Sequence, residues 1–397
     1  MQITRKVTDN ITWVGASDRR LSRFENLFPI SRGVSYNSYV INDEKTALMD
    51  TADASVREQF LENVKYALSG KELDYLVVDH MEPDHCSMIV DILKLYPKAV
   101  MVGNAKTFQF FGQMYSEDIE GRTLVVKEGD KLSLGKHELT FVMAPMVHWP
   151  EAMVSYDSYD KALFSADAFG TFGALNGALF NDEVDFERDW LDDARRYYTN
   201  IVGKYGMPVQ NLLKKAAALD ISFICPLHGP VWRSDIAWFI DKYNKWSSYV
   251  PEESRVLIIY GSMYGNTEAV ANKLATELSE LGEKKIEVFD ASNTDVSVLV
   301  SESFRCDRIV IASPTYNGGI YPSIENYLNH ISALALQGRE VAIIENGTWA
   351  PMAGKQISEK LSAMKNMTVL EKIVTVKSSA NETVCNDILE LARTLSR

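Results

Sequence analysis

The stretch Asp79-His80-Met81-Glu82-Pro83-Asp84-His85, or DHMEPDH, decides the fold of the N-terminal half of the chain. It follows the apolar run 76–78, which predicts a buried strand. Its four potential metal ligands are His80, Glu82, Asp84 and His85. Two imidazoles and two carboxylates this close would repel or desolvate one another without a cation. The alternative is a fully solvated loop. The stretch therefore predicts a metal site at the end of a strand.

Three further potential ligands also follow predicted apolar strands. They are His148, Asp167 and His228. Loops at the carboxyl ends of strands in layered α/β folds converge, so these side chains are expected to meet. A single histidine in such a place is more often a hydrogen-bonded structural residue, but the four segments together favour one shared site. The remaining histidines differ, because His137 lies in a predicted exposed turn and His330 in a predicted helix.

The composition is that of a globular chain of 397 residues, long enough for two or three domains. A net charge of -13 argues against non-specific binding to nucleic acid or to an anionic membrane. No apolar run approaches the roughly 20 residues that span a bilayer, and MQITRKVTDN lacks the apolar core of a signal peptide. The four cysteines are far apart, without a C-x-x-C pair. We therefore expect a cytoplasmic protein with no rubredoxin-like iron module of its own.

The polar stretch KWSSYVPEES, residues 245–254, predicts a boundary between two domains, residues 1–250 and 251–397. Beyond it, apolar strands alternate strictly with helices, which predicts a doubly wound, five-stranded parallel sheet like that of flavodoxin. Before it, predicted strands such as 35–41 and 47–50 occur in clusters. That pattern predicts a mixed α/β layer arrangement and leaves its topology open.

The pattern H-x-E-x-D-H, followed by histidine, aspartate and histidine after later strands, resembles the metallo-β-lactamase superfamily. The zinc hydrolases of that superfamily usually carry H-x-H-x-D-H, whereas this chain has Glu82 at the second histidine. The exchange adds a hard oxygen ligand and a negative charge, which favours iron or manganese over two zinc ions. Together with the flavodoxin-like half, the pattern is similar to the flavodiiron proteins over essentially the whole chain. The resemblance implies an N-terminal αββα sandwich.

The same resemblance implies how seven ligands would be shared between two iron ions. His80, Glu82 and His148 would bind one iron, Asp84, His85 and His228 the other, and Asp167 would bridge them. All seven positions match the family pattern, and two cations would neutralise the three crowded carboxylates. Tyr197 and Tyr198 are candidates for contacts beside these ligands, with ordinary helix packing as the alternative.

Three loops after strands of the C-terminal half predict a site for flavin mononucleotide (FMN). The first presents backbone N–H groups and a helix N-terminus to a phosphate, and it is similar to the flavodoxin loop S/T-x-T-G-N-T. The other two place a large aromatic side chain beside glycine and asparagine, as loops flanking an isoalloxazine ring would. The alternatives are an N-capping turn and aromatic packing between loops. With no second nucleotide motif, FMN is favoured over FAD. The predicted residues are Ser262, Met263, Tyr264, Gly265, Asn266, Thr267, Pro314, Thr315, Tyr316, Asn317, Gly318, Asn346, Gly347, Thr348 and Trp349.

A reduced FMN and two ferrous ions hold four electrons, which is the number that reduces dioxygen to water. Two electrons reduce two molecules of nitric oxide to nitrous oxide and water. The flavodiiron resemblance thus implies an oxygen reductase, a nitric oxide reductase, or both, and the sequence does not rank them. Since no NAD site is visible, it implies a separate electron donor such as a rubredoxin. It also implies a head-to-tail homodimer, or a dimer of such dimers.

Two other functions fit parts of the pattern. One is a dizinc hydrolase with a flavodoxin-like accessory domain, against which Glu82 argues. The other is a non-enzymatic flavin electron carrier or redox sensor with a structural metal site. Closed structural sites usually use cysteine and histidine, and no cysteine belongs to the ligand set.

Overall fold

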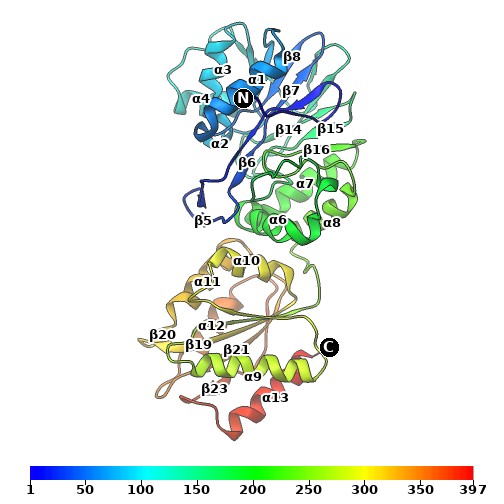
Figure 1. Cartoon of the computed structure of the whole chain (residues 1–397). Coiled ribbons are helices and arrows are strands. Elements are labelled where there is room, and N and C mark those ends of the chain that lie inside the picture. Colours follow the sequence, from blue (N-terminus) through cyan, green and yellow to red (C-terminus); the bar gives the residue numbers. More distant parts are fainter. Residues whose placement is uncertain (397) are drawn as a thin grey trace. The chain divides into compact units, whose positions relative to one another are not determined.

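The computed structural model describes residues 1–396 and divides into two compact units, shown in Figure 1. Unit 1 comprises Met1–Tyr198 and Tyr205–Asn244, and unit 2 comprises Thr199–Lys204 and the chain from Lys245 onward. The units therefore divide at the N-terminal end of the predicted linker. None of the helices between residues 1 and 396 is long and apolar enough to cross a membrane.

Unit 1 contains many short strands and eight α-helices. The strands are β1 (Arg5–Lys6), β2 (Ile11–Trp13), β3 (Ala16–Asp18), β4 (Arg23–Phe24), β5 (Phe28–Pro29), β6 (Val34–Tyr36), β7 (Tyr39–Asn42), β8 (Thr46–Met49), β9 (Tyr75–Val77), β10 (Val100–Gly103), β11 (Thr123–Val125), β12 (Lys131–Ser133), β13 (Glu138–Met143), β14 (Met153–Asp157), β15 (Ala162–Phe164) and β16 (Phe223–Cys225). The helices are α1 (Arg57–Leu68), α2 (Pro83–Cys86), α3 (Ile89–Leu95), α4 (Ala105–Met114), α5 (Phe186–Asp189), α6 (Leu191–Tyr197), α7 (Gly206–Ala216) and α8 (Ile236–Ser247), the last of which crosses the division between the units.

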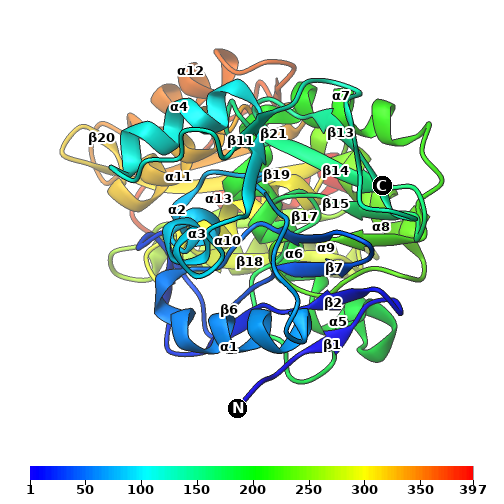
Figure 2. The same cartoon turned by 90° about the horizontal axis from the view of Figure 1, so that it is seen from above.

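Two sheets form the layers of unit 1. The 7-stranded sheet has the order β1-β2-β7-β8-β9-β10-β11, and the 5-stranded sheet has the order β12-β13-β14-β15-β16. Both sheets are mixed. In the first, β1, β2, β7 and β8 pair antiparallel and β8 to β11 pair in parallel. In the second, β12 to β15 pair antiparallel and β15 pairs in parallel with β16. Helix α1 packs on β7 and α4 on β10, and Figure 2 labels α1, α4 and β7. This is the layered, metallo-β-lactamase-like arrangement that the resemblance implies, and the predicted fold class is confirmed.

Unit 2 is a doubly wound sheet. Its strands are β17 (Val256–Tyr260), β18 (Ile286–Asp290), β19 (Arg308–Tyr316), β20 (Gly319–Ile320), β21 (Glu340–Asn346), β22 (Thr368–Val369) and β23 (Val374–Val376), and its helices are α9 (Asn266–Glu280), α10 (Val296–Arg305), α11 (Pro322–Ala333), α12 (Ala353–Ser362) and α13 (Glu382–Leu395). The order β18-β17-β19-β21-β22 is the flavodoxin order. The fifth position is divided between β22 and β23, which both pair in parallel with β21, and β20 adds an antiparallel edge to β19.

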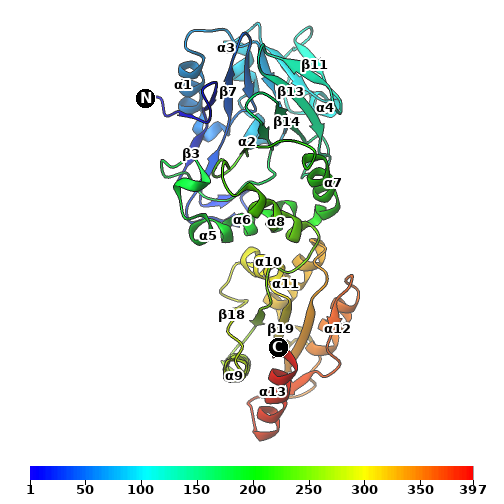
Figure 3. The same cartoon turned by 90° about the vertical axis from the view of Figure 1, so that its right-hand side faces the viewer.

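Successive residues of β17 explain why both faces of this sheet are covered. Leu257 and Ile259 belong to a buried cluster with α10, α11 and α12, whereas Val256 and Ile258 belong to another with α9 and α13. Figure 3 shows α12 and the pair α9 and α13 on opposite faces. Because side chains alternate along a strand, an unbroken apolar strand requires helices on both sides.

Two local predictions in unit 1 are wrong. The single strand expected at 35–41 is split into β6 and β7, because Asn37 Nδ2 donates to the carbonyl oxygens of Pro226 and Gly229 and takes the chain out of the sheet. His137, expected in an exposed turn, is completely buried. Its Nδ1 lies 2.9 Å from Asp157 Oδ2, a partner 20 residues further along the chain.

Candidate functional site

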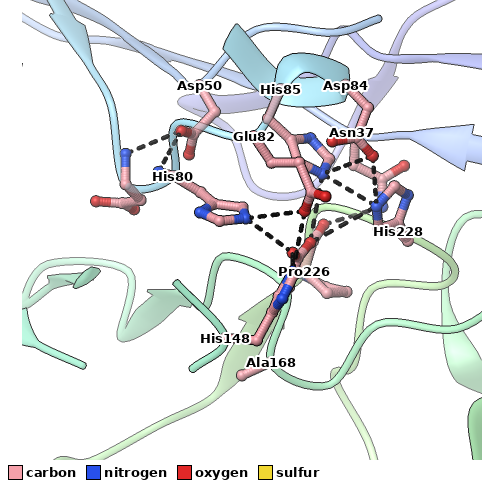
Figure 4. Close-up of polar contacts among 12 residues, drawn as sticks. Asn37, Asp50, His80, Glu82, Asp84, His85, His148, Ala168, Pro226 and His228 are labelled. Atoms are coloured by element: carbon pink, nitrogen blue, oxygen red, sulfur yellow. Dashed lines mark hydrogen bonds and ion pairs between the residues drawn. The ribbon is translucent and has the colours of Figure 1, made fainter. Parts of the chain in front are cut away.

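All seven predicted metal ligands of unit 1 lie together where four strands end. The DHMEPDH loop follows β9, and its second half forms the short helix α2. His148 follows β13, Asp167 follows β15 and His228 follows β16. In Figure 4 the labelled ligands point toward one another from the DHMEPDH stretch and from the loops of His148 and His228. The structure thus brings together every residue that the sequence placed in this site.

Four of the seven residues form one group. Nε2 of His80 lies 3.2 Å from Glu82 Oε2 and 3.1 Å from Asp167 Oδ2. Nε2 of His148 lies 2.9 Å and 3.1 Å from the same two oxygens. Two ring nitrogens and two carboxylate oxygens therefore enclose one point, as the ligands of a single ion do.

The second group lies on the other side of Asp167. Asp84 Oδ2 is 3.3 Å from Nε2 of both His85 and His228, and these two nitrogens are only 3.0 Å apart. Asp167 Oδ1 lies 3.3 Å from His85 Nε2 and 3.6 Å from His228 Nε2. Asp167 thus presents Oδ2 to the first group and Oδ1 to the second.

The charges of the site oppose the effect of burial. Burial alone would lower the pKa of His148, but hydrogen bonds to Asp167 and Glu82 raise it to about 9. Burial likewise disfavours the charged form of His80, yet Asp167 raises the pKa of this imidazole well above its usual value. Conversely, the imidazoles hold the pKa of buried Asp167 well below its usual range. The site therefore favours positive charge at its centre, which metal cations would supply.

Several buried polar atoms of the site have no hydrogen-bond partner among residues 1–396. They are both carboxylate oxygens of Asp84, Oδ1 of Asp167 and Nδ1 of His85. Leaving a buried acceptor unsatisfied costs about 1–3 kcal/mol, and a cation coordinated by the oxygens would remove that cost. The donor set contains imidazole nitrogen and carboxylate oxygen and no thiolate, which fits iron or manganese.

Sequence reasoning missed two buried carboxylates behind the DHMEPDH loop. Glu151 Oε1 lies 2.9 Å from His80 Nδ1 and accepts the N–H of Met81 at 2.9 Å. Asp50 Oδ1 accepts the N–H groups of Asp79 and His80 at 2.8 Å and 3.1 Å. Asp50 could have been found because it ends a predicted strand. Glu151 could have been found because it lies in the loop that carries His148.

The two tyrosines at the end of α6 differ in their surroundings. Tyr197 is completely buried, its ring centroid lies 5.5 Å from that of His228, and its hydroxyl has no hydrogen-bond partner in the described chain. Tyr198 packs edge to face on Tyr243, with ring centroids 5.0 Å apart. Tyr197 is therefore the one next to a potential ligand, and a functional role for either residue stays a prediction.

In unit 2 the three predicted loops border one pocket of about 590 Å³. All of the residues predicted for FMN except Gly265 line it. Gly265 instead precedes α9 with φ +86°, a conformation that glycine adopts easily. The sequence missed Ser378, which lines the pocket and donates its hydroxyl to Thr348 Oγ1 at 2.8 Å.

Known proteins resemble this chain across both units. Residues 34–229 match the family described as ODP family beta lactamase, and residues 257–376 match a flavodoxin domain. A nitric oxide reductase of Moorella thermoacetica is 33% identical over 94% of this chain and 92% of its own length.

Solved structures also resemble this chain across both units. The rubredoxin oxygen:oxidoreductase of Desulfovibrio gigas superposes with a TM-score of 0.91 at 28% identity, covering 99% of this chain and 98% of that one. The flavodiiron protein of Giardia intestinalis superposes with a TM-score of 0.93 at 26% identity, covering 100% and 96%. Since both units match in one continuous alignment, this chain belongs to the flavodiiron proteins.

Proposed function

We propose that this protein is an oxidoreductase that reduces dioxygen to water, nitric oxide to nitrous oxide, or both, at a diiron centre supplied with electrons by FMN. Asp167 carries the proposal, because its two oxygens face two separate groups of ligands. A carboxylate placed in this way can bridge two metal ions, and paired ions can hold two small ligands side by side. The names of relatives, nitric oxide reductase and rubredoxin oxygen:oxidoreductase, support the same reaction class.

The side chains of unit 1 would divide the metal ions between them. His80, Glu82 and His148 would hold one iron, and Asp84, His85 and His228 the other, with Asp167 shared. The three carboxylates would leave two ferrous ions with a net charge of only +1, which suits a buried site. Bound iron and FMN supply the redox chemistry that these side chains lack.

The pocket of unit 2 would hold FMN. The first N–H groups of α9 have no partner within the helix and, with the hydroxyls of Ser262 and Thr267, suit a phosphate. Tyr316 and Trp349 expose 44% and 82% of their surface beside the pocket and are free to stack on a flavin ring.

Two kinds of protein partner follow from the proposal. Electrons would come from a separate small donor such as a rubredoxin. Two copies of the chain would pair head to tail, so that the flavin of one serves the metal centre of the other, and two such dimers could associate further. Analytical ultracentrifugation tests the pairing, because a monomer with full activity would contradict it.

The proposal is tested by the iron, zinc and FMN content per chain, measured on protein expressed with iron supplied. We expect two irons and one FMN per chain. We also expect a measured amount of oxygen or nitric oxide, added to an otherwise oxygen-free solution, to be consumed when a reduced rubredoxin is supplied. Two zinc ions that iron does not displace would contradict the reductase and leave the hydrolase as the better function.

A further inference from the structure

Both ring nitrogens of His80 and the imidazole ring itself contact neighbouring side chains. Its Nε2 faces Glu82 and Asp167, and the indole of Trp149 meets its ring edge to face at 5.5 Å and 89°. Its other nitrogen, Nδ1, lies 2.9 Å from Glu151 Oε1. With the proton of the neutral ring on Nδ1, where it is donated to Glu151, the lone pair of Nε2 is directed at the metal position.

Glu151 is itself fixed by several contacts. Its side chain is buried, and Oε1 also accepts the N–H of Met81 at 2.9 Å. Its carbonyl oxygen accepts from Asn104 Nδ2 at 2.5 Å. Glu151 lies three residues after His148 and therefore joins the loop that carries one ligand to the loop that carries another.

We propose that Glu151 is a positioning residue of the metal centre, and this inference rests on the proposed function. It keeps His80 in the tautomer and orientation that present Nε2 to the iron of the first group. Its negative charge also makes the imidazole a stronger metal ligand. Carboxylates that accept from metal-binding histidines typically change metal affinity 10–100-fold when they are removed.

The effect is confined to one of the two metal positions. In the second group, Nδ1 of His228 lies 2.7 Å from the neutral carbonyl oxygen of Ser35. Nδ1 of His85 has no hydrogen-bond partner among residues 1–396. Neither histidine has a carboxylate hydrogen-bonded to its Nδ1 among the described residues. Removing the charge of Glu151 is therefore expected to weaken the first iron and leave the second unchanged.

The test is Glu151→Gln in the full-length protein loaded with 57Fe. The amide keeps an oxygen that can accept from His80 and Met81 but removes the charge. We expect one of two irons to be lost to a competing chelator at a concentration about 10–100-fold lower than for wild type. In Mössbauer spectra recorded before chelation, one quadrupole doublet should change and the other should remain.

The chain offers a matched control in the buried pair His137–Asp157, whose Nδ1 to Oδ2 distance is also 2.9 Å. Asp157→Asn removes the same kind of charge without touching any of the seven predicted iron ligands, so both irons should be retained with unchanged doublets. Wild-type iron affinity and spectra in folded Glu151→Gln would overturn the proposal.

A wild-type protein without two irons would instead contradict the proposed function. Should Glu151→Gln fail to fold, Glu151→Asp takes its place. Its shorter carboxylate retracts from His80 and should also release one iron, and wild-type behaviour in that variant would equally overturn the proposal.

Discussion

Glu82 is the residue that separates this chain from the zinc hydrolases that its first half resembles. Its Oε2 lies against Nε2 of both His80 and His148. In Glu82→His an imidazole replaces the charged oxygen, which favours zinc. We expect the variant, expressed with equal iron and zinc, to take up more zinc than wild type and to lose at least about tenfold in reductase turnover.

Metal content and oxygen consumption measured on the same samples check this prediction. Glu72→His is the control, because it adds a histidine at an exposed position of the same unit. A folded Glu82→His variant with two irons and wild-type turnover would show that the oxygen ligand does not decide the metal.

Tyr197 tests the cost of a buried hydroxyl without a partner. Because its oxygen makes no hydrogen bond with the described residues, Tyr197→Phe should leave the free energy of unfolding unchanged or raise it by up to about 1 kcal/mol. Urea unfolding measures this value. Iron content should stay the same, so any change in turnover would report a role beside the ligands.

Tyr243 provides the comparison for Tyr197. It is also completely buried, but its hydroxyl accepts the N–H of Phe169 at 2.6 Å. Tyr243→Phe should lower the free energy of unfolding by about 1 kcal/mol. Equal destabilisation by the two substitutions would contradict the distinction.

At the scale of elements, Glu253 holds the start of β17 in place. Burial alone would raise the pKa of Glu253, but ion pairs with Lys285, Arg305 and Arg255 lower it to about 2. Since the folded pKa lies below that of the unfolded chain, about 4.3, the stabilisation is fully present above that pH. It is lost as the pH falls from there toward 2.

Glu253→Gln should therefore lower the free energy of unfolding of unit 2 by about 1–2 kcal/mol at pH 7. The difference from wild type should shrink below about pH 4.3. Urea unfolding, monitored by circular dichroism at pH 7 and at a pH below about 4.3, checks this prediction. Glu371→Gln, at an exposed position, is the control. A deficit that is constant with pH would contradict the ion-pair explanation.

The helices and strands that could be predicted from the sequence are those whose pattern of apolar residues lies within the element itself. Strands β17, β19 and β21 of unit 2 contain continuous apolar runs, and the alternation of Val256 and Leu257 between two clusters follows from the geometry of one strand. The break between β6 and β7 was not predictable, because Asn37 takes its partners from residues almost two hundred positions away. The buried contact between His137 and Asp157 was missed because it depends on the pairing of β13 with β14, which the sequence left open.

At the scale of the whole chain, the ligand motif predicted more than hydrophobic periodicity did. Clustered short strands left the topology of unit 1 open, whereas H-x-E-x-D-H identified both its fold class and a set of residues that the structure brings together. The motif specifies the spacing of the residues that would bind the metal ions. Neighbours such as Glu151, which only position those residues, have no characteristic spacing in the sequence. This is why the surroundings of the site required the structure.

The two units should also respond separately to metal removal. Unit 1 buries Asp84 and Asp167 with oxygens that have no hydrogen-bond partner in the described chain, so iron is expected to stabilise this unit in particular. A ligand at 1,000 times its dissociation constant contributes about 4 kcal/mol, and about 2–4 °C of melting temperature per kcal/mol applies to a unit of this size. Chelation should therefore lower the melting temperature of unit 1 by about 8–16 °C. The temperature at which flavin fluorescence reports release of FMN from unit 2 should change by no more than about 2 °C.

Removal of FMN from iron-loaded protein is the reciprocal control and should lower only the melting temperature of unit 2. Equal shifts of both transitions on chelation would mean that the units unfold as one, or that iron is not held by unit 1.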